Sequence, residues 1–92
     1  MTIEEALSLV DILLKPKGLS DVQEHVFCQV WAGQSYTKIA KDLGYDEGYI
    51  RHVGARLWQL LSKAFGERVT KSNLHSVLRR RVLQTTSSLD LR

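Results

Sequence analysis

One segment restricts the fold more than any other part of the chain: Y-T-K-I-A-K-D-L-G-Y-D-E-G-Y-I-R-H-V. It indicates two helices joined by a tight turn. It predicts a short helix over residues 37–43 and a longer helix over residues 47–65. Ala40 lies where the two helices can cross, because a small side chain lets their backbones approach closely. Gly44 can take the left-handed conformation that ends the short helix, and Ile50 is spaced to hold the longer one against a core. The segment is therefore typical of a helix-turn-helix.

The rest of the chain also has the signals of helices. Capping boxes at Thr2 and Ser20 predict the starts of two helices before this segment, and Thr70 is expected to cap another one after it. The β-branched residues nowhere alternate over a useful length, so no strand is predicted. We predict an all-α, five-helix helix-turn-helix domain over residues 1–83, with an added N-terminal and C-terminal helix. A polar tail or linker is expected over residues 84–92.

The charge of the chain is small in total but unevenly distributed. A length of 92 residues is expected to form one domain, and its net charge of +3 is too weak to indicate a nucleic-acid partner. Residues 1–33 carry a net −3, whereas residues 34–66 carry +2 and residues 67–92 carry +4. A polyanion is therefore expected to approach the second half of the chain.

Several classes of function are disfavoured by composition and spacing. No apolar run approaches the roughly 18 residues of a membrane helix, so we expect a cytoplasmic protein with no membrane partner. The lone Cys28 excludes an internal disulfide, and the histidines fall on different predicted helices without metal-ligand spacing. We expect no enzymatic activity, no cofactor, no metal and no small-molecule substrate.

The central motif resembles a known DNA-reading motif. I-A-K-D-L-G-Y-D-E-G-Y-I-R-H-V is similar to the EIA-x-x-LG-x-S-EGTV-K-x-H core of LuxR-type regulators and of sigma-factor DNA-reading domains. The resemblance implies that the helix over residues 47–65 is a recognition helix. It also implies that Arg51 and His52 face the DNA groove or its phosphates.

A second resemblance extends over almost the whole chain. M-T-I-E-E-A-L-S-L-V-D, K-G-L-S-D-V-Q-E and L-W-Q-L-L-S-K-A-F-G-E-R-V-T-K-S-N resemble the N-terminal helix-turn-helix (vMAP-type) module of large cyanobacterial signalling proteins. In that family the module is followed by a STAND ATPase of NB-ARC type, a MoxR-type or protease effector region, or WD repeats. This sequence has no G-x-x-x-x-G-K-[ST] loop, so the resemblance implies a recognition or adaptor head whose chemistry lies elsewhere.

The candidate DNA contacts are the polar side chains left to face outward from the two helices. Arg51 could bind guanine with two hydrogen bonds, and lysines of the short helix could hold phosphates. The expected set is Lys38, Lys41, Tyr49, Arg51, His52 and Arg56. An exposed arginine can equally be only solvated, and the run Arg79–Arg81 can either complement a helix dipole or bind phosphate.

Acidic residues at the start of the recognition helix argue against DNA binding. Asp46 is explained as a helix cap, but Glu47 has no such role in the sequence and would place a negative charge near the groove. The competing hypothesis is therefore a helical adaptor that binds a protein partner and no DNA.

A candidate protein interface comes from apolar residues that exceed the needs of one small core. Leu9 and Ile12 fall outside the apolar stripe of the first helix. Gly54, Trp58 and Phe65 lie along one edge of the long helix, where Gly54 admits a close neighbour, either the fifth helix or another subunit. We expect Leu9, Ile12, Trp58 and Phe65 to contact a homodimer partner or another docked protein.

Overall fold

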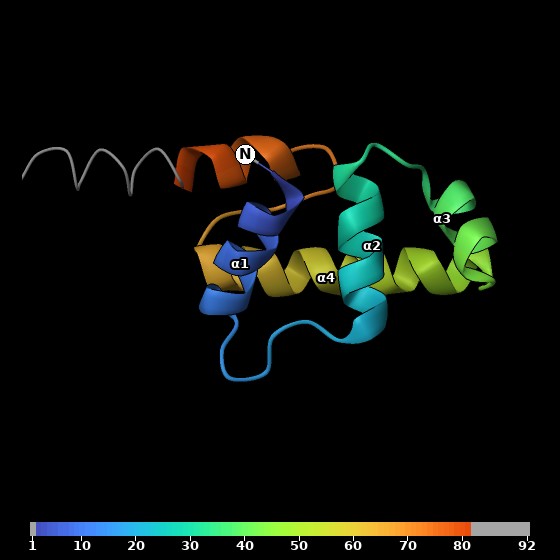
Figure 1. Cartoon of the computed structure of the whole chain (residues 1–92), viewed down its shortest axis with the longest axis horizontal. Helices are drawn as coiled ribbons and strands as arrows, with labels where there is room; N and C mark the ends of the chain where they lie inside the picture. The colour runs from blue at the N-terminus through green and yellow to red at the C-terminus, as the bar shows by residue number, and fades with distance from the viewer. Residues whose placement is uncertain (1, 82–92) are drawn as a thin grey trace, which may run out of the picture.

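The computed structural model describes residues 2–81, and this part of the chain is helical without strands (Figure 1). Its elements are α1 (Ile3–Leu13), α2 (Asp21–Trp31), α3 (Tyr36–Leu43), α4 (Glu47–Phe65) and a helical segment over residues 74–81. The predicted all-α helix-turn-helix class is confirmed. The expected end of the domain at residue 83 and the expected tail over residues 84–92 lie outside the described residues.

The helices begin where the sequence supplies caps. The Thr2 hydroxyl accepts a hydrogen bond from the Glu5 N–H at 3.2 Å, and the Glu5 carboxylate accepts one from the Thr2 N–H at 2.7 Å. Ser20 and Gln23 form the same reciprocal pair at the start of α2. Each arrangement satisfies two backbone donors that the first turn of a helix leaves free.

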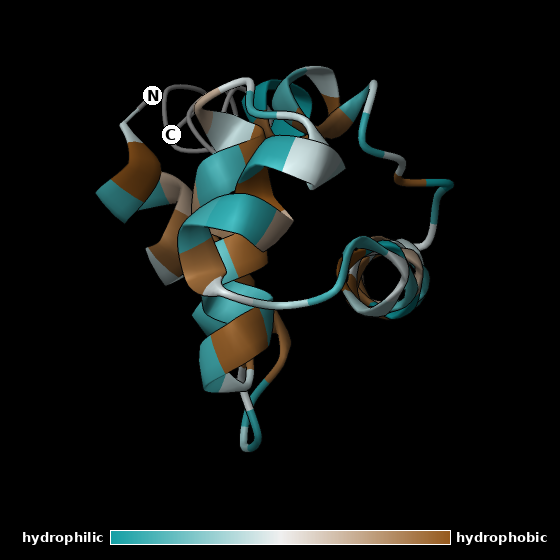
Figure 2. Ribbon diagram, turned by 90° about the vertical axis from the view of Figure 1, so that its right-hand side faces the viewer, coloured by the Kyte–Doolittle hydropathy of each residue, from teal (hydrophilic) through white to brown (hydrophobic). Residues whose placement is uncertain are grey.

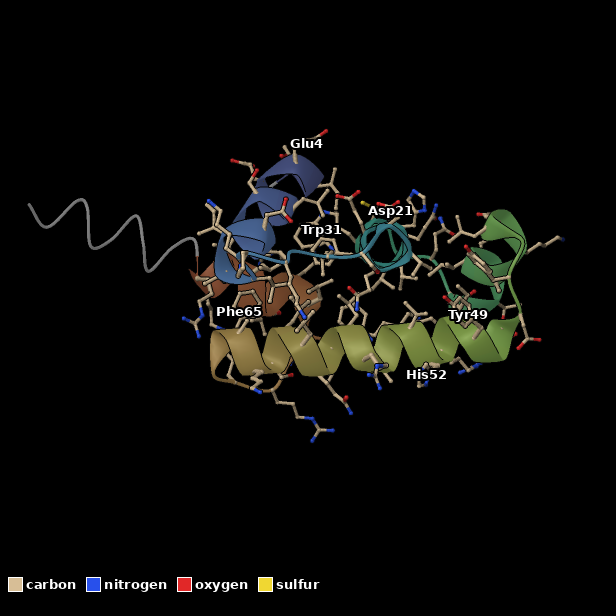
Figure 3. The ribbon with its side chains drawn as sticks, turned by 90° about the horizontal axis from the view of Figure 1, so that it is seen from below. Glu4, Asp21, Trp31, Tyr49, His52 and Phe65 are labelled. Atoms are coloured by element: carbon tan, nitrogen blue, oxygen red, sulfur yellow. The ribbon has the colours of Figure 1, made fainter. Side chains whose placement is uncertain are left out.

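The long helix α4 organises the molecule. With 19 residues it spans about 28 Å. α2 and α3 make its most extensive contacts, and α2 crosses it near the middle in Figure 1. Seen from below in Figure 3, α1, α2 and α3 all lie on the same side of α4. No helix within residues 2–81 covers the opposite side of α4.

The core lies between α4 and the elements stacked on it. Hydrophobic and hydrophilic residues alternate along the helices in Figure 2, as expected when each helix buries one face. Phe27 of α2 and Leu57 and Leu61 of α4 are fully buried. Each side chain of this size stabilises the fold by roughly 1.5–3 kcal/mol when it leaves water.

The turn between α3 and α4 has the predicted geometry. Ile39 and Ile50 are fully buried, and Ala40 is 4% exposed. Gly44 has a φ of +75°, and the next N–H donates to the Ala40 carbonyl at 3.0 Å. Asp46 caps α4 by accepting the Gly48 and Tyr49 N–H groups. Ala40, Gly44 and Ile50 therefore have the roles in the turn that the sequence predicted.

The close neighbour of Gly54 is neither the fifth helix nor another subunit. A Cβ atom at Gly54 would lie 2.6 Å from the hydroxyl oxygen of Tyr36, the first residue of α3. The Trp58 indole donates a hydrogen bond of 2.8 Å to the same hydroxyl. Gly54 is therefore needed to admit the Tyr36 side chain, a packing contact within the chain.

Two of the expected interface residues lie in the core. Trp58 is only 8% exposed because Tyr36 covers its indole, and Phe65 is 3% exposed. The Arg81 guanidinium lies 5.5 Å from the centre of the Phe65 ring and donates to the Phe65 carbonyl. These two aromatic residues are corrected from a surface role to a packing role. Of the other two, Leu9 is half-buried and Ile12 is 62% exposed.

Candidate nucleic-acid interface

One exposed side of α4 carries a row of polar residues. Their spacing of three or four residues places them along one line of the helix, over about 21 Å. We call this row the outer stripe, and its members are Tyr49, His52, Arg56, Gln59 and Lys63. Figure 3 shows His52 on the side of α4 opposite α1 and α2. The sequence has no acidic residue between Tyr49 and Phe65, so the stripe is basic along its length.

Glu47, which the sequence left as an unexplained acid, joins the two helices. Its Oε1 accepts a hydrogen bond of 2.8 Å from the Thr37 hydroxyl of α3. Its Oε2 accepts from Arg51 Nε at 2.9 Å and Arg51 Nη2 at 2.6 Å. The Arg51 hydrogen bonds first, and then that from Thr37, hold the pKa of the Glu47 carboxyl below its usual range. The negative charge near the expected groove is therefore paired.

Arg51 is held in place by this pair but remains accessible. Its side chain is 60% exposed, and its guanidinium carbon lies 5.7 Å from the centre of the Tyr36 ring. An exposed ion pair exchanges readily with other charged partners because water screens it. Some of the Arg51 N–H groups are therefore able to donate to a phosphate or a base edge.

Lys71 contacts the same Tyr36 ring as Arg51, a contact that the sequence did not indicate. It follows α4 in the turn before residues 74–81, yet its Nζ lies 4.9 Å from the centre of the Tyr36 ring. A cation over an aromatic face is attracted by the negative charge above the ring. Two cations from distant parts of the sequence, Arg51 and Lys71, therefore converge on Tyr36. No sequence signal connects positions separated in this way.

The lysines of α3 are exposed but unequal. Lys38 forms an ion pair with Asp42 at 3.2 Å, one helical turn away, whereas Lys41 makes no ion pair within the described residues. At the turn, the rings of Tyr45 and Tyr49 lie 5.1 Å apart, and both are nearly half exposed. Tyr49, the first residue of the outer stripe, is thus half of an aromatic pair.

Two arginines of the C-terminal segment fasten the end of α4. Arg80 forms an ion pair with Glu67 at 2.8 Å, and Arg81 lies 3.8 Å from the same carboxylate. Because Arg81 also donates to the last carbonyl of α4, this part of the run serves a helix end. Arg79 is exposed.

The described residues contain no other site with evident chemistry. No group of three or more His, Cys, Asp or Glu residues between 2 and 81 could hold a metal ion. Cys28 is half-buried, and burial raises the pKa of its thiol, which makes the nucleophilic thiolate scarcer. None of the helices in the same range is long and apolar enough to cross a membrane.

Comparison with known proteins finds a matching family. The family described as vWA-MoxR associated protein N-terminal HTH matches residues 1–81, which include every helix of the structure described above. No curated protein and no solved structure matches the chain. The chain therefore belongs to the family of N-terminal helix-turn-helix domains of vWA-MoxR associated proteins.

Proposed function

We propose that this domain binds duplex DNA through the first half of α4. The observation that carries the proposal is the outer stripe, which is exposed, basic and presented by a helix-turn-helix whose packed side faces the other way. The major groove of B-DNA admits one α-helix, and the N-terminal residues of a recognition helix contact its bases. α4 is long enough to enter the groove while its second half stays packed on α1.

The side chains divide by the part of DNA that each can reach. In this proposal His52 and Arg56, on the outer stripe, contact base edges. Arg51 and Lys71, gathered at Tyr36, lie to one side of that stripe and suit the phosphates of one strand. Lys41, which no carboxylate of residues 2–81 pairs with, suits a phosphate near α3.

We further place this module at the head of a larger signalling ATPase in the cytoplasm. Its family is named for association with vWA and MoxR proteins, which supports a multi-protein signalling context. A STAND ATPase of NB-ARC type is the other arrangement that the sequence resemblance implies. The domain itself is proposed to be non-catalytic, so its role is recognition.

The test is a titration of fluorescent duplex DNA of mixed sequence at several salt concentrations. We expect saturable binding that weakens steeply as salt rises from about 50 to 200 mM, because phosphate contacts release counterions. Arg56→Glu should abolish the binding. Arg79→Glu, which makes the same charge change on another exposed arginine, should not. Absence of saturable binding at about 50 mM salt would contradict the proposal.

The alternative function is a helical adaptor that binds protein and no DNA. It is favoured by one observation, the exposure of Ile12 (62%) and Leu13 (39%) at the end of α1. Exposed large apolar side chains that lie next to each other often mark protein interfaces. If DNA does not bind, this surface becomes the functional one.

A further inference from the structure

A groove runs between the second half of α4 and the loop that joins α1 to α2. Two adjoining hollows, of about 410 and 250 Å³, form it. Both contain Leu14 and Leu60 in their walls, and Ala64 completes the apolar floor. The groove is therefore lined by side chains that gain stability when another molecule excludes water from them.

The rim of this groove is positively charged. Lys15 and Lys17 lie on the loop side, and Lys63 lies on the α4 side. None of the residues that line the two hollows is acidic, and none of these three lysines forms an ion pair within residues 2–81. We call the floor and rim together the basic groove. A partner that carries carboxylates beside an apolar side chain would satisfy both parts.

The outer side of α1 has the complementary chemistry. Helical geometry places five exposed residues on one face, and we call it the acidic face. Its members are Glu4, Glu5, Ser8, Asp11 and Ile12. Ile12 is the most exposed large hydrophobic residue of the described chain, at 62%. Neither Glu4 nor Asp11 forms an ion pair within residues 2–81.

We propose that the basic groove binds the acidic face of α1 from a second copy of this chain. In a two-fold symmetric dimer each copy supplies one groove and one acidic face, so the same contact forms twice. Ile12 of one copy covers the leucine floor of the other, and the carboxylates of α1 lie beside the lysine rim. The complement to the groove is thus carried by the chain itself, which is why a second copy is the occupant that we choose.

This contact leaves the proposed DNA surface open. The groove uses residues 60–64 of α4, whereas the proposed base contacts lie in the first half of the same helix. Lys63 is the one outer-stripe residue that the two surfaces share. Two copies held through α1 would present two α4 helices, as dimeric helix-turn-helix proteins do on two half-sites.

The experiment measures self-association without DNA. Sedimentation equilibrium of the chain should show a monomer–dimer equilibrium that weakens between about 50 and 500 mM salt. Ile12→Ser, at an exposed position, should weaken the dimer at least tenfold with an unchanged circular dichroism spectrum. Lys41→Glu, on exposed α3, is the matched control and should leave the dimer intact. A chain that stays monomeric at all concentrations, or a dimer that Ile12→Ser does not weaken, overturns the proposal.

A charge-exchange pair identifies the two surfaces. The Lys15→Glu, Lys63→Glu variant and the Glu4→Lys, Asp11→Lys variant should each be monomeric. A mixture of the two should form a 1:1 dimer, because each acidic surface then meets a basic one. A mixture that stays monomeric contradicts the contact. If instead the wild-type chain is monomeric and the Lys15→Glu, Lys63→Glu variant loses DNA binding, the groove is part of a nucleic-acid surface and the dimer proposal is wrong.

Discussion

The Trp58 indole N–H donates a hydrogen bond of 2.8 Å to the Tyr36 hydroxyl and so joins the middle of α4 to the first residue of α3. Gly54 lies beneath the same hydroxyl, one helical turn before Trp58. The crossing of the two helices is therefore fixed at a second place, far from the Gly44 turn. The orientation of the outer stripe relative to α3 depends on the Gly44 turn and on the contact between Tyr36 and Trp58.

Removal of the Tyr36 hydroxyl tests this link. Tyr36→Phe keeps the ring but leaves the part-buried Trp58 N–H without its acceptor, which should cost about 1 kcal/mol of unfolding free energy. Urea denaturation followed by tryptophan fluorescence would measure it. Tyr45→Phe changes an exposed tyrosine in the same way and should leave stability unchanged. Equal effects of the two substitutions would contradict the role of the hydrogen bond.

Addition of a methyl group at Gly54 tests the close approach. Alanine is the better helix former by about 1 kcal/mol, so Gly54→Ala would stabilise an open position. Here the new Cβ would meet the Tyr36 side chain at 2.6–2.9 Å, and we expect a net loss of roughly 1–3 kcal/mol from overpacking. Thermal unfolding would show whether the substitution raises or lowers the stability. A raised melting temperature would mean that Tyr36 moves aside without cost.

The pairing of Glu47 predicts a dependence of stability on pH. Its pKa is lowered from the ordinary 4.5 in the folded chain, so its contribution to stability is present above pH 4.5. That contribution is lost as the pH falls through the lowered pKa. Glu47→Gln should therefore lower the melting temperature near pH 7 and have progressively less effect in acid. A difference that is the same at pH 7 and pH 3 would show that the charge is not responsible.

Lys71 should act as a phosphate contact if the proposed function is correct. Lys71→Ala should weaken binding to all duplex sequences by a similar factor and reduce the slope of log K against log salt by about 0.9. It should leave sequence preference unchanged, whereas His52→Ala should alter it. Binding of two duplexes of different sequence across a salt series separates these effects. A change in preference caused by Lys71→Ala would contradict its assignment to phosphate.

Local signals were sufficient to predict the helices and their turn. The capping boxes at Thr2 and Ser20, the left-handed Gly44 and the buried Ile50 each act within a few residues of their position in the sequence. Short-range geometry of this kind depends on the sequence neighbours alone. The domain class followed from it.

Contacts between distant residues were not predicted in the same way. The sequence indicated Trp58 as a candidate interface residue because its cover, Tyr36, lies 22 positions away on another helix. Of the two partners of Glu47, only Thr37 depends on α3 folding back on α4. Arg51 lies four residues on in the same helix, a local spacing from which the pair could have been predicted. Lys71, like Thr37, reaches its partner from a distant part of the sequence. Such contacts depend on how the helices cross, and the spacing of apolar residues along the sequence does not specify that crossing.

The one-sided stacking of α1, α2 and α3 on α4 has a kinetic consequence. A ligand that approaches the exposed side of α4 finds a preformed surface. In the described part of the chain no lid has to open and no segment has to fold before it binds. Encounter is then limited by diffusion and orientation, and long-range attraction by the basic side chains can accelerate it. Differences in affinity among ligands would consequently reside in how slowly each one leaves.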